Sequence, residues 1–211
     1  MSGKFIVFEG IDCCGKTTQI TLLYNRLSAN GITCNIEVEP TRSPVGKVIR
    51  QEYLSGNHTM IPRCLNMLFT VDRYDHITNE DHGLRSKLER GINILQDRYY
   101  LSGVAYYSCS VPTHQSLRMQ RENIDLLRPT LTVFIDIDPA VSIERLKNGR
   151  DHREIYETYE KQKQVRYAYW DTLKLFEAEG DEFFIVNGEG GIYDVHEQIW
   201  NRVYPILKGD T

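Results

Sequence analysis

The fold is decided by the stretch Phe5-Ile6-Val7-Phe8-Glu9-Gly10-Ile11-Asp12-Cys13-Cys14-Gly15-Lys16-Thr17-Thr18. Four apolar residues lead into Glu9, and the pattern G-x-x-x-x-G-K-T then runs from Gly10 to Thr17. This is the pattern of a phosphate-binding loop. A strand is predicted over about Phe5 to Glu9, and apolar residues at helical spacing follow the loop. The stretch therefore predicts a strand, a nucleotide-binding loop and a helix in succession.

The residue types of this loop suit a phosphate. Gly10 and Gly15 let the backbone bend so that consecutive N–H groups face one point, and the positive end of the following helix adds to that field. Lys16 is expected to reach the β- and γ-phosphates, and the Thr17 hydroxyl is expected to ligate magnesium. The remaining loop residues expected at the nucleotide are Ile11, Asp12, Cys13, Cys14 and Thr18. A glycine-rich corner without a ligand is the plainer alternative, and the motif alone does not say what happens to the nucleotide.

The composition sets further bounds. At 211 residues the chain is expected to form one α/β domain. The net charge of -4 favours neither a nucleic acid nor an anionic membrane as a partner, no apolar run approaches the roughly 20 residues of a membrane helix, and no signal peptide is visible. The five cysteines are scattered without C-x-x-C spacing, which indicates reduced thiols in the cytoplasm rather than disulfides or zinc ligands.

Strand patterns alternate with helix patterns along the rest of the chain. Strands are predicted over about 5–9, 33–39, 91–97, 131–136 and 182–186. Helices are predicted after the loop as far as about 28, over 45–54, from Pro62 to about Leu88, over 102–107 and 115–127, from Pro139 onward, and over 192–207. This alternation predicts an α/β fold with a five-stranded parallel sheet covered by helices on both faces.

A second signal is Asp97-Arg98-Tyr99, at the carboxyl end of the third predicted strand. Ligands of open parallel sheets bind beyond these strand ends. Asp97 beside the phosphate loop would hold magnesium, directly or through water, and Arg98 would form a bidentate fork onto a second phosphate. An ordinary surface ion pair would explain the tripeptide alone, but its pairing with the phosphate loop favours a site.

These motifs, taken together, resemble those of the thymidylate kinase family. The chain from Phe8 to Gln19 resembles the opening of that family, and the family's D-R-Y-x-x-S-x-x-A-Y signature is similar to Asp97-Arg98-Tyr99-Tyr100-Leu101-Ser102-Gly103-Val104-Ala105-Tyr106. Further similar segments are Leu68-Phe69-Thr70-Val71-Asp72-Arg73 and Phe134-Ile135-Asp136-Ile137-Asp138-Pro139. The resemblance covers most of the chain. It implies a P-loop nucleotide kinase fold with a small lid, which transfers the γ-phosphoryl of ATP to dTMP with Mg²⁺ and acts as a cytoplasmic homodimer in dTTP synthesis.

The resemblance also implies how the acceptor is bound. Phe69 would stack on thymine, Arg73 would bond its carbonyl edge, and Ser102 would contact the base. Plainer alternatives are core packing for Phe69, a solvated helix charge for Arg73, and an N-cap for Ser102. Tyr106 would fill the space of a ribose 2′-hydroxyl, with packing as its alternative.

The remaining implied roles concern the phosphates and the donor. Arg98 would clamp the acceptor's 5′-phosphate, and Asp12 would face the sugar 3′-hydroxyl or the incoming phosphate. A carboxylate so close to phosphates is costly unless magnesium or arginine offsets it, so Asp12 argues for function. Tyr156 and Gln162 correspond to positions near the nucleotide sugar and base, or they are surface-helix residues.

Two departures from the family pattern bear on catalysis. Many bacterial relatives carry Arg where this chain has Val38, and Arg42 would then supply the phosphate contact unless it is a solvated loop charge. Some relatives carry Arg in the loop at the place of Cys13. The missing cation would come from the basic lid segment of about 145–157, in which Arg150 and Arg153 are both candidates; a charged surface run is the alternative.

Other functions remain open at this point. A kinase of the same fold could act on another nucleotide or a nucleoside, although Arg98 suits a phosphorylated acceptor. A GTP-driven switch would show N-K-x-D after a late strand, where this chain has Asn187-Gly188-Glu189. A catalytically silent nucleotide-binding homologue is a third possibility, since Cys13 and Val38 replace expected arginines.

Overall fold

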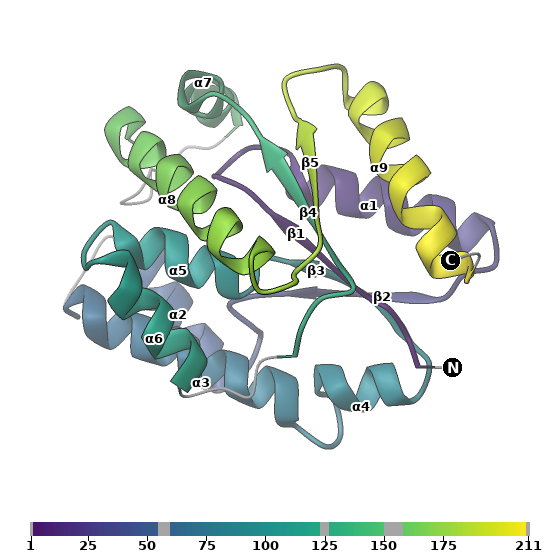
Figure 1. Ribbon diagram of the computed structural model, residues 1–211, viewed down its shortest axis with the longest axis horizontal. Helices are drawn as coiled ribbons and strands as arrows, with labels where there is room; N and C mark the ends of the chain where they lie inside the picture. Colours follow the sequence, from purple (N-terminus) through teal and green to yellow (C-terminus); the bar gives the residue numbers. More distant parts are fainter. Residues whose placement is uncertain (1, 55–59, 123–126, 150–157, 210–211) are drawn as a thin grey trace.

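The computed structural model describes residues 2–54, 60–122, 127–149 and 158–209 (Figure 1). Within these ranges five strands form one parallel sheet with the order β2-β3-β1-β4-β5. The strands are β1 (Phe5–Glu9), β2 (Cys34–Val38), β3 (Asn93–Asp97), β4 (Leu131–Asp136) and β5 (Phe183–Asn187). The predicted five-stranded parallel sheet is confirmed.

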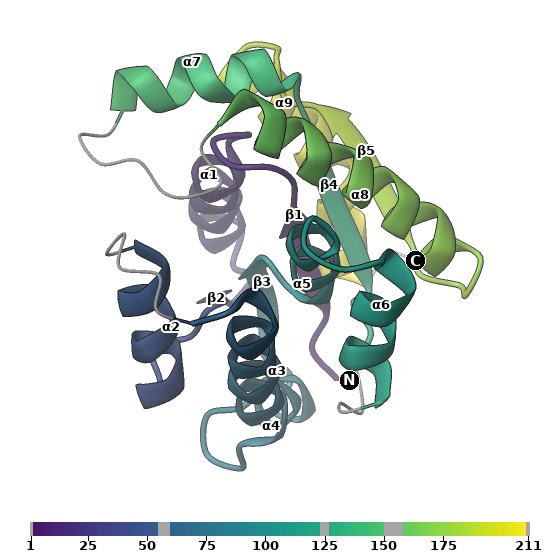
Figure 2. The same cartoon turned by 90° about the vertical axis from the view of Figure 1, so that its left-hand side faces the viewer.

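Helices cover both faces of this sheet, as predicted. They are α1 (Lys16–Ala29), α2 (Pro44–Leu54), α3 (Pro62–Thr78), α4 (Leu84–Glu89), α5 (Tyr100–Ser108), α6 (Thr113–Glu122), α7 (Pro139–Gly149), α8 (Tyr159–Glu177) and α9 (Ile192–Lys208). Helices α1 and α9 pack together on one face, and α5 and α8 pack together on the other (Figures 1 and 2). None of the helices in the described ranges is long and apolar enough to cross a membrane.

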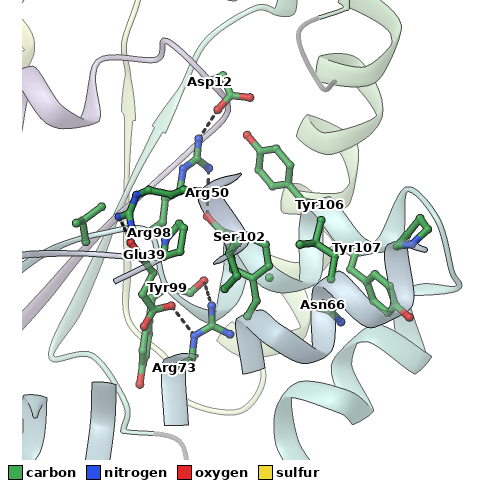
Figure 3. Close-up of a pocket in the computed structure, with 17 residues that line it drawn as sticks. Asp12, Glu39, Arg50, Asn66, Arg73, Arg98, Tyr99, Ser102, Tyr106 and Tyr107 are labelled. Carbon is green, nitrogen blue, oxygen red and sulfur yellow. Dashed lines mark hydrogen bonds and ion pairs between the residues drawn. The ribbon is translucent and has the colours of Figure 1, made fainter. Parts of the chain in front are cut away.

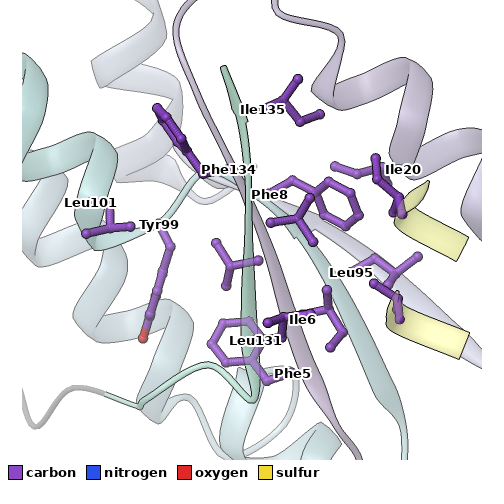
Figure 4. Packing of buried hydrophobic residues seen from close by; sticks show 14 of the residues in the cluster. Phe5, Ile6, Phe8, Ile20, Leu95, Tyr99, Leu101, Leu131, Phe134 and Ile135 are labelled. Atoms are coloured by element: carbon purple, nitrogen blue, oxygen red, sulfur yellow. The ribbon is translucent and has the colours of Figure 1, made fainter. Parts of the chain in front are cut away.

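The core lies on both sides of the two central strands. Every residue of β1 is buried, and so are the first five residues of β4. Parallel strands covered on both faces are expected to be apolar throughout, and Phe5, Phe8 and Phe134 pack with helix residues such as Ile20 and Leu101 (Figure 4). Two polar residues of these strands are also buried: Thr132 within β4, and Glu9, a carboxylate at the end of β1.

The parallel register brings the carboxyl ends of the strands to one edge of the sheet. Phe8 pairs with Asp97, Val38 pairs with Asp97, and Glu9 pairs with Phe134. The segments that follow β1, β2 and β3 therefore start side by side. The phosphate loop follows β1, Glu39 follows β2 and Arg98 follows β3.

One predicted helix is wrong in extent. The helix predicted from Pro62 to about Leu88 is two helices, α3 and α4, with a break between Thr78 and Leu84. At this break the Asn79 side chain accepts bonds from the backbone N–H groups of Asp81 and His82, at 3.1 and 3.3 Å. Asn competes in this way with the helical hydrogen bonds, and the apolar pattern did not reveal it.

Smaller boundary errors have local causes. The strand predicted from Gly91 begins at Asn93, because Gly91 takes φ 80° and Ile92 donates to the carbonyl of Lys87 to close α4. The short helix predicted over 102–107 spans Tyr100–Ser108, and the helix predicted over 115–127 begins at Thr113 and is described as far as Glu122. Residues 123–126 lie outside the described ranges.

Candidate active site

The phosphate loop joins β1 to α1 in a conformation with several positive φ angles. The φ angle is 144° at Gly10, 55° at Cys13 and 106° at Gly15. A Cβ atom on Gly10 would lie 2.5 Å from the carbonyl oxygen of Ile135, so this position requires glycine. Backbone N–H groups in such a turn converge on one point at a helix N-terminus, which is a site for an anion.

Lys16 is held against this loop. Its side chain is buried, and its Nζ donates to the carbonyl oxygens of Gly10 and Ile11 at 3.0 Å each. The Nζ atom also lies 3.6 Å from the Sγ of Cys14. The loop thereby holds a positive charge at the start of α1.

The two residues predicted to hold a metal are neighbours. Thr17 Oγ1 donates to Asp97 Oδ2 at 2.9 Å, which joins the start of α1 to the end of β3. A hydroxyl and a carboxylate are the hard oxygen donors that Mg²⁺ prefers, and Mg²⁺ usually takes few protein ligands together with substrate phosphates. This donor set fits the metal. In the described part of the chain, His, Cys, Asp and Glu form no group of three that could hold a metal by themselves.

Asp12 lies between two other elements of the site. One carboxylate oxygen forms an ion pair with Arg98, and the other accepts a bond from Gln162 Nε2 at 2.7 Å. Gln162, which is fully buried on α8, also accepts from the Asp12 backbone N–H at 3.2 Å. Burial would raise the pKa of the Asp12 carboxyl, but the positive charges of Arg98 and Lys16 outweigh burial and hold that pKa below its ordinary value.

Arg98 occupies a strained position at the end of β3. Its φ is 66°, an unusual value for a residue with a side chain. Its guanidinium carbon lies 5.0 Å from the centre of the Tyr106 ring, and its NH1 donates to Ser102 Oγ at 3.3 Å. Arg98 therefore reaches from the phosphate loop to α5, and Figure 3 shows it between Asp12 and Ser102.

A cavity of about 330 Å³ opens beside Arg98. Its lining includes five charged side chains and a larger apolar and aromatic set (Figure 3). The charged residues are Asp12, Glu39, Arg50, Arg73 and Arg98, and the aromatic residues are Phe69, Tyr99, Tyr106 and Tyr107. Three cations face two anions next to flat apolar surfaces, so the cavity suits a flat ligand that carries negative charge.

Two residues of α3 that were predicted at the acceptor lie on this wall. Phe69 is half-buried and lines the cavity. Arg73 is buried, not a solvated helix charge, and its Nε donates to Glu39 Oε2 at 2.7 Å. Its NH2 donates to the Tyr99 carbonyl at 3.1 Å.

Ser102 lies within α5, so the N-cap alternative for this residue is wrong; the N-cap position is Tyr99. Ser102 Oγ instead donates to Glu9 Oε2 at 2.5 Å and lies 2.7 Å from the hydroxyl of Tyr169, which itself donates to Glu9 at 2.9 Å. Burial raises the pKa of the Glu9 carboxyl, against the lowering effects of its bond from Ser102 and the charge of Arg98. Glu9 thus ties β1 to the start of α5.

Other predicted residues are placed differently. Arg42 is exposed and is not among the residues that line the cavity, whereas Arg50 on α2 is among them. Arg150, Arg153 and Tyr156 lie outside the described residues.

Several residues at the site were missed by sequence reasoning. Glu9 was seen only as the end of a strand, although a lone carboxylate closing an apolar run is itself a signal. Arg145 on α7 was placed in the lid, yet it donates to the carbonyl of Cys13 at 3.2 Å and to that of Gly188 at 2.8 Å. Arg50 carried no motif, because nothing in the sequence shows that α2 turns this side chain toward the cavity.

Comparisons with known proteins agree on one family. The family model described as thymidylate kinase matches residues 8–199. A thymidylate kinase of Bifidobacterium longum subsp. infantis is 35% identical over 211 residues, which cover 96% of this chain and 85% of the relative. A thymidylate kinase of Plasmodium falciparum is 33% identical, with 97% and 91% covered. A thymidylate kinase of Caldanaerobacter subterraneus is 30% identical, with 99% of each chain covered.

Proposed function

We propose, because this chain belongs to the thymidylate kinase family, that its cavity binds dTMP and its phosphate loop binds ATP. The chain phosphorylates dTMP, as its family membership shows. In our proposal the γ-phosphoryl of ATP passes directly to the phosphate of dTMP, giving dTDP and ADP. Residues 1–211 act as one kinase domain, with a lid at about 145–157.

The observation that carries this proposal is the position of Arg98. Its guanidinium pairs with Asp12 of the phosphate loop and also lines the cavity. An anion bound by Arg98 in the cavity would therefore lie next to the loop that holds the donor phosphates. Transfer between two bound phosphates needs this adjacency more than it needs a base, because the acceptor oxygen is already anionic.

The chain's own cations neutralise the charges that meet during transfer. Lys16 exchanges its bonds to the Gly10 and Ile11 carbonyls for bonds to donor phosphate oxygens, and Arg98 holds the acceptor phosphate. Mg²⁺, held by Thr17 and Asp97, would neutralise charge on the donor phosphates when bound. Arg150 and Arg153 in the lid supply a further cation as it closes, in place of the arginine that Cys13 replaces.

The acceptor base is recognised on the α3 and α5 side of the cavity. Phe69 stacks on thymine, Arg73 bonds its carbonyl edge, and Ser102 contacts the base from α5. Tyr106 occupies the space of a ribose 2′-hydroxyl and so favours deoxynucleotides. Gln162 acts through Asp12, and Tyr156 contacts the nucleotide from the lid.

The activity is tested by a coupled assay of ADP release with ATP, Mg²⁺ and a panel of monophosphates. We expect rapid ADP release with dTMP and slower release with dUMP, dCMP and UMP, because Phe69, Arg73 and Tyr106 select base and sugar. Omission of Mg²⁺ or addition of EDTA should abolish the signal. Silence with the whole panel would leave the chain a binding protein, and preference for another monophosphate would refute the substrate.

The second cation at the acceptor phosphate is Arg50 in our proposal, rather than Arg42. Arg50→Gln should raise the KM for dTMP about tenfold, since a charge-assisted bond to phosphate is lost. Arg42→Gln should change it less than about twofold, because an exposed charge contributes little. Steady-state kinetics of both variants at saturating ATP measure the difference. A larger effect at Arg42 would reverse the assignment.

We also propose that the protein acts in the cytoplasm as a homodimer. An apolar stripe on α3 supports the dimer: Met67, Val71 and Tyr74 lie at helical spacing and are 49%, 53% and 51% exposed. Apolar side chains at i, i+4 and i+7 form one face of a helix. A second copy would cover this face.

A further inference from the structure

A line of charged side chains runs from partly exposed positions at α4 to buried positions at the wall of the cavity. Its members alternate in sign when His76 is protonated, and in order they are Lys87, Glu37, His76, Glu39 and Arg73. We call this set the charge line. Its exposure decreases from 21% at the Glu37 side chain to 5%, 3% and 2% at His76, Glu39 and Arg73. Arg73 and Glu39 line the cavity, whereas His76 lies behind them.

The contacts along the charge line are direct. Arg73 Nε donates to one oxygen of Glu39 at 2.7 Å, and His76 Nδ1 lies 3.1 Å from the other oxygen. His76 Nε2 lies 3.5 Å from Glu37 Oε2. Both carboxylate oxygens of Glu39 are therefore bonded, one to the residue at the cavity and one to His76.

The sequence explains why these groups meet. Glu37 and Glu39 are two residues apart along an extended segment, so both carboxylates point to the same side of β2. Arg73 and His76 are three residues apart on α3, so they share a face of that helix. The Glu39 backbone is fixed as well, because its N–H donates to the Asp97 carbonyl at 3.1 Å.

The charge of His76 matters to this arrangement. Two carboxylates on one side of a strand repel each other, and a cation between them removes the repulsion. Burial lowers the pKa of His76, but its interactions with the carboxylates of Glu37 and Glu39 outweigh burial and raise this pKa to about 9. The other charged groups nearby are Lys87 of α4 beside Glu37 and Arg73 of α3 beside Glu39.

We propose that His76 is a positioning residue for the acceptor pocket. By bridging Glu37 and Glu39, it holds the Glu39 carboxylate in the orientation that fixes Arg73 at the cavity wall. His76 does not touch the substrate itself. This inference rests on the proposed binding of dTMP in the cavity.

Loss of His76 should affect binding of the acceptor dTMP and not binding of ATP. If His76 is lost, Glu39 keeps its backbone position but its carboxylate can turn toward solvent or away from Glu37. Arg73 then loses a fixed carboxylate partner, although it keeps its bond to the Tyr99 carbonyl. Donor binding should be unaffected, because Lys16 bonds Gly10 and Ile11 and Thr17 bonds Asp97, none of which belongs to the charge line.

The first test replaces His76 with glutamine, which preserves a polar side chain but removes the charge. His76→Gln should raise the KM for dTMP about tenfold with kcat changed less than about threefold and the KM for ATP unchanged. The matched control is His82→Gln, an exposed histidine in the loop after α3, which should leave all three constants unchanged. A structural defect alone would instead lower the active fraction, and hence kcat, without this split.

The second test uses pH. The folded pKa of His76 is raised to about 9, so its positive charge is present at neutral pH and is lost as the pH rises through about 9. The ratio of the KM for dTMP between His76→Gln and the wild type should be about ten at neutral pH and should fall toward one above about pH 9. Taking the ratio cancels the titration of other groups and of the substrate.

A third variant keeps the inference testable if His76→Gln does not fold. Glu37→Gln removes one partner of the imidazole at a partly exposed position, so it should lower the pKa of His76 in NMR titration and move the alkaline rise of the KM to lower pH. An unchanged KM for dTMP in His76→Gln, or an unchanged alkaline limb in Glu37→Gln, would overturn the inference. Turnover of dTMP by the wild type tests the proposed function separately, since it does not depend on these ratios.

Discussion

Replacing Lys16 with alanine is expected to lower kcat about 10²–10³-fold, the effect of removing one preorganised donor from developing negative charge. Lys16 is the cationic residue of the loop motif. Its ammonium group donates to the carbonyls of Gly10 and Ile11, next to the backbone N–H groups of the loop. The loss should appear in kcat more than in the KM for ATP, because the lysine bonds the phosphates most strongly as charge shifts between them. Single-turnover kinetics with saturating ATP and dTMP measure this step directly.

The control for this variant is Lys174→Ala, an exposed lysine on α8 that should keep wild-type rates. Far-UV circular dichroism and thermal unfolding should show that both variants keep the fold, since α1 and its packing do not depend on the Lys16 charge. Near-normal turnover in Lys16→Ala with an intact fold would refute the catalytic assignment of this residue.

Replacing Arg98 with glutamine is expected to lower kcat/KM for dTMP about 10²–10³-fold, because one bound cation is lost from both the acceptor and the transferred phosphoryl group. The variant should also be less stable. The charge of Arg98 is the largest of the effects that lower the pKa of Asp12 against burial. Its removal should therefore raise that pKa and leave a half-buried carboxylate poorly paired.

The two effects of Arg98→Gln can be separated with a second substitution. The double variant Asp12→Asn/Arg98→Gln should recover much of the stability, because the unpaired carboxylate is gone, but it should recover no activity. The control is Arg202→Gln on α9, which removes an exposed ion pair with Glu182 and should keep both properties. Activity restored together with stability would show that Arg98 is only structural.

The fold was largely predictable because its central strands are buried on both faces. The segments around Phe8 and Phe134 are continuous apolar runs, and such runs fix strands in a parallel sheet without further information. The break between α3 and α4 was not predictable from the apolar pattern. It depends on the Asn79 side chain bonding the backbone two and three residues later, a local alternative to the helix that a periodic pattern does not register.

The site was predictable where its residues are neighbours in sequence. The phosphate loop follows β1, Asp97 ends the neighbouring strand β3 and Arg98 follows it, so the parallel register alone brings them together. The cavity wall was harder, because it depends on which face of each helix turns inward. Arg50, Glu39 and His76 lie outside the motif segments, and their positions depend on the packing of α2 and α3 rather than on spacing.

The two contacts of Asp12 have a consequence for how the substrates influence each other. Arg98 approaches this carboxylate from the acceptor side, and Gln162 approaches it from α8, the helix that follows the proposed lid. A ligand that draws Arg98 away removes one partner of the Asp12 carboxylate. A movement that shifts Gln162 removes the other. Thermodynamic linkage then requires reciprocity: whatever factor dTMP applies to the affinity for ATP, ATP applies to the affinity for dTMP. Asp12 would then be the group through which bound dTMP and bound ATP change each other's affinity.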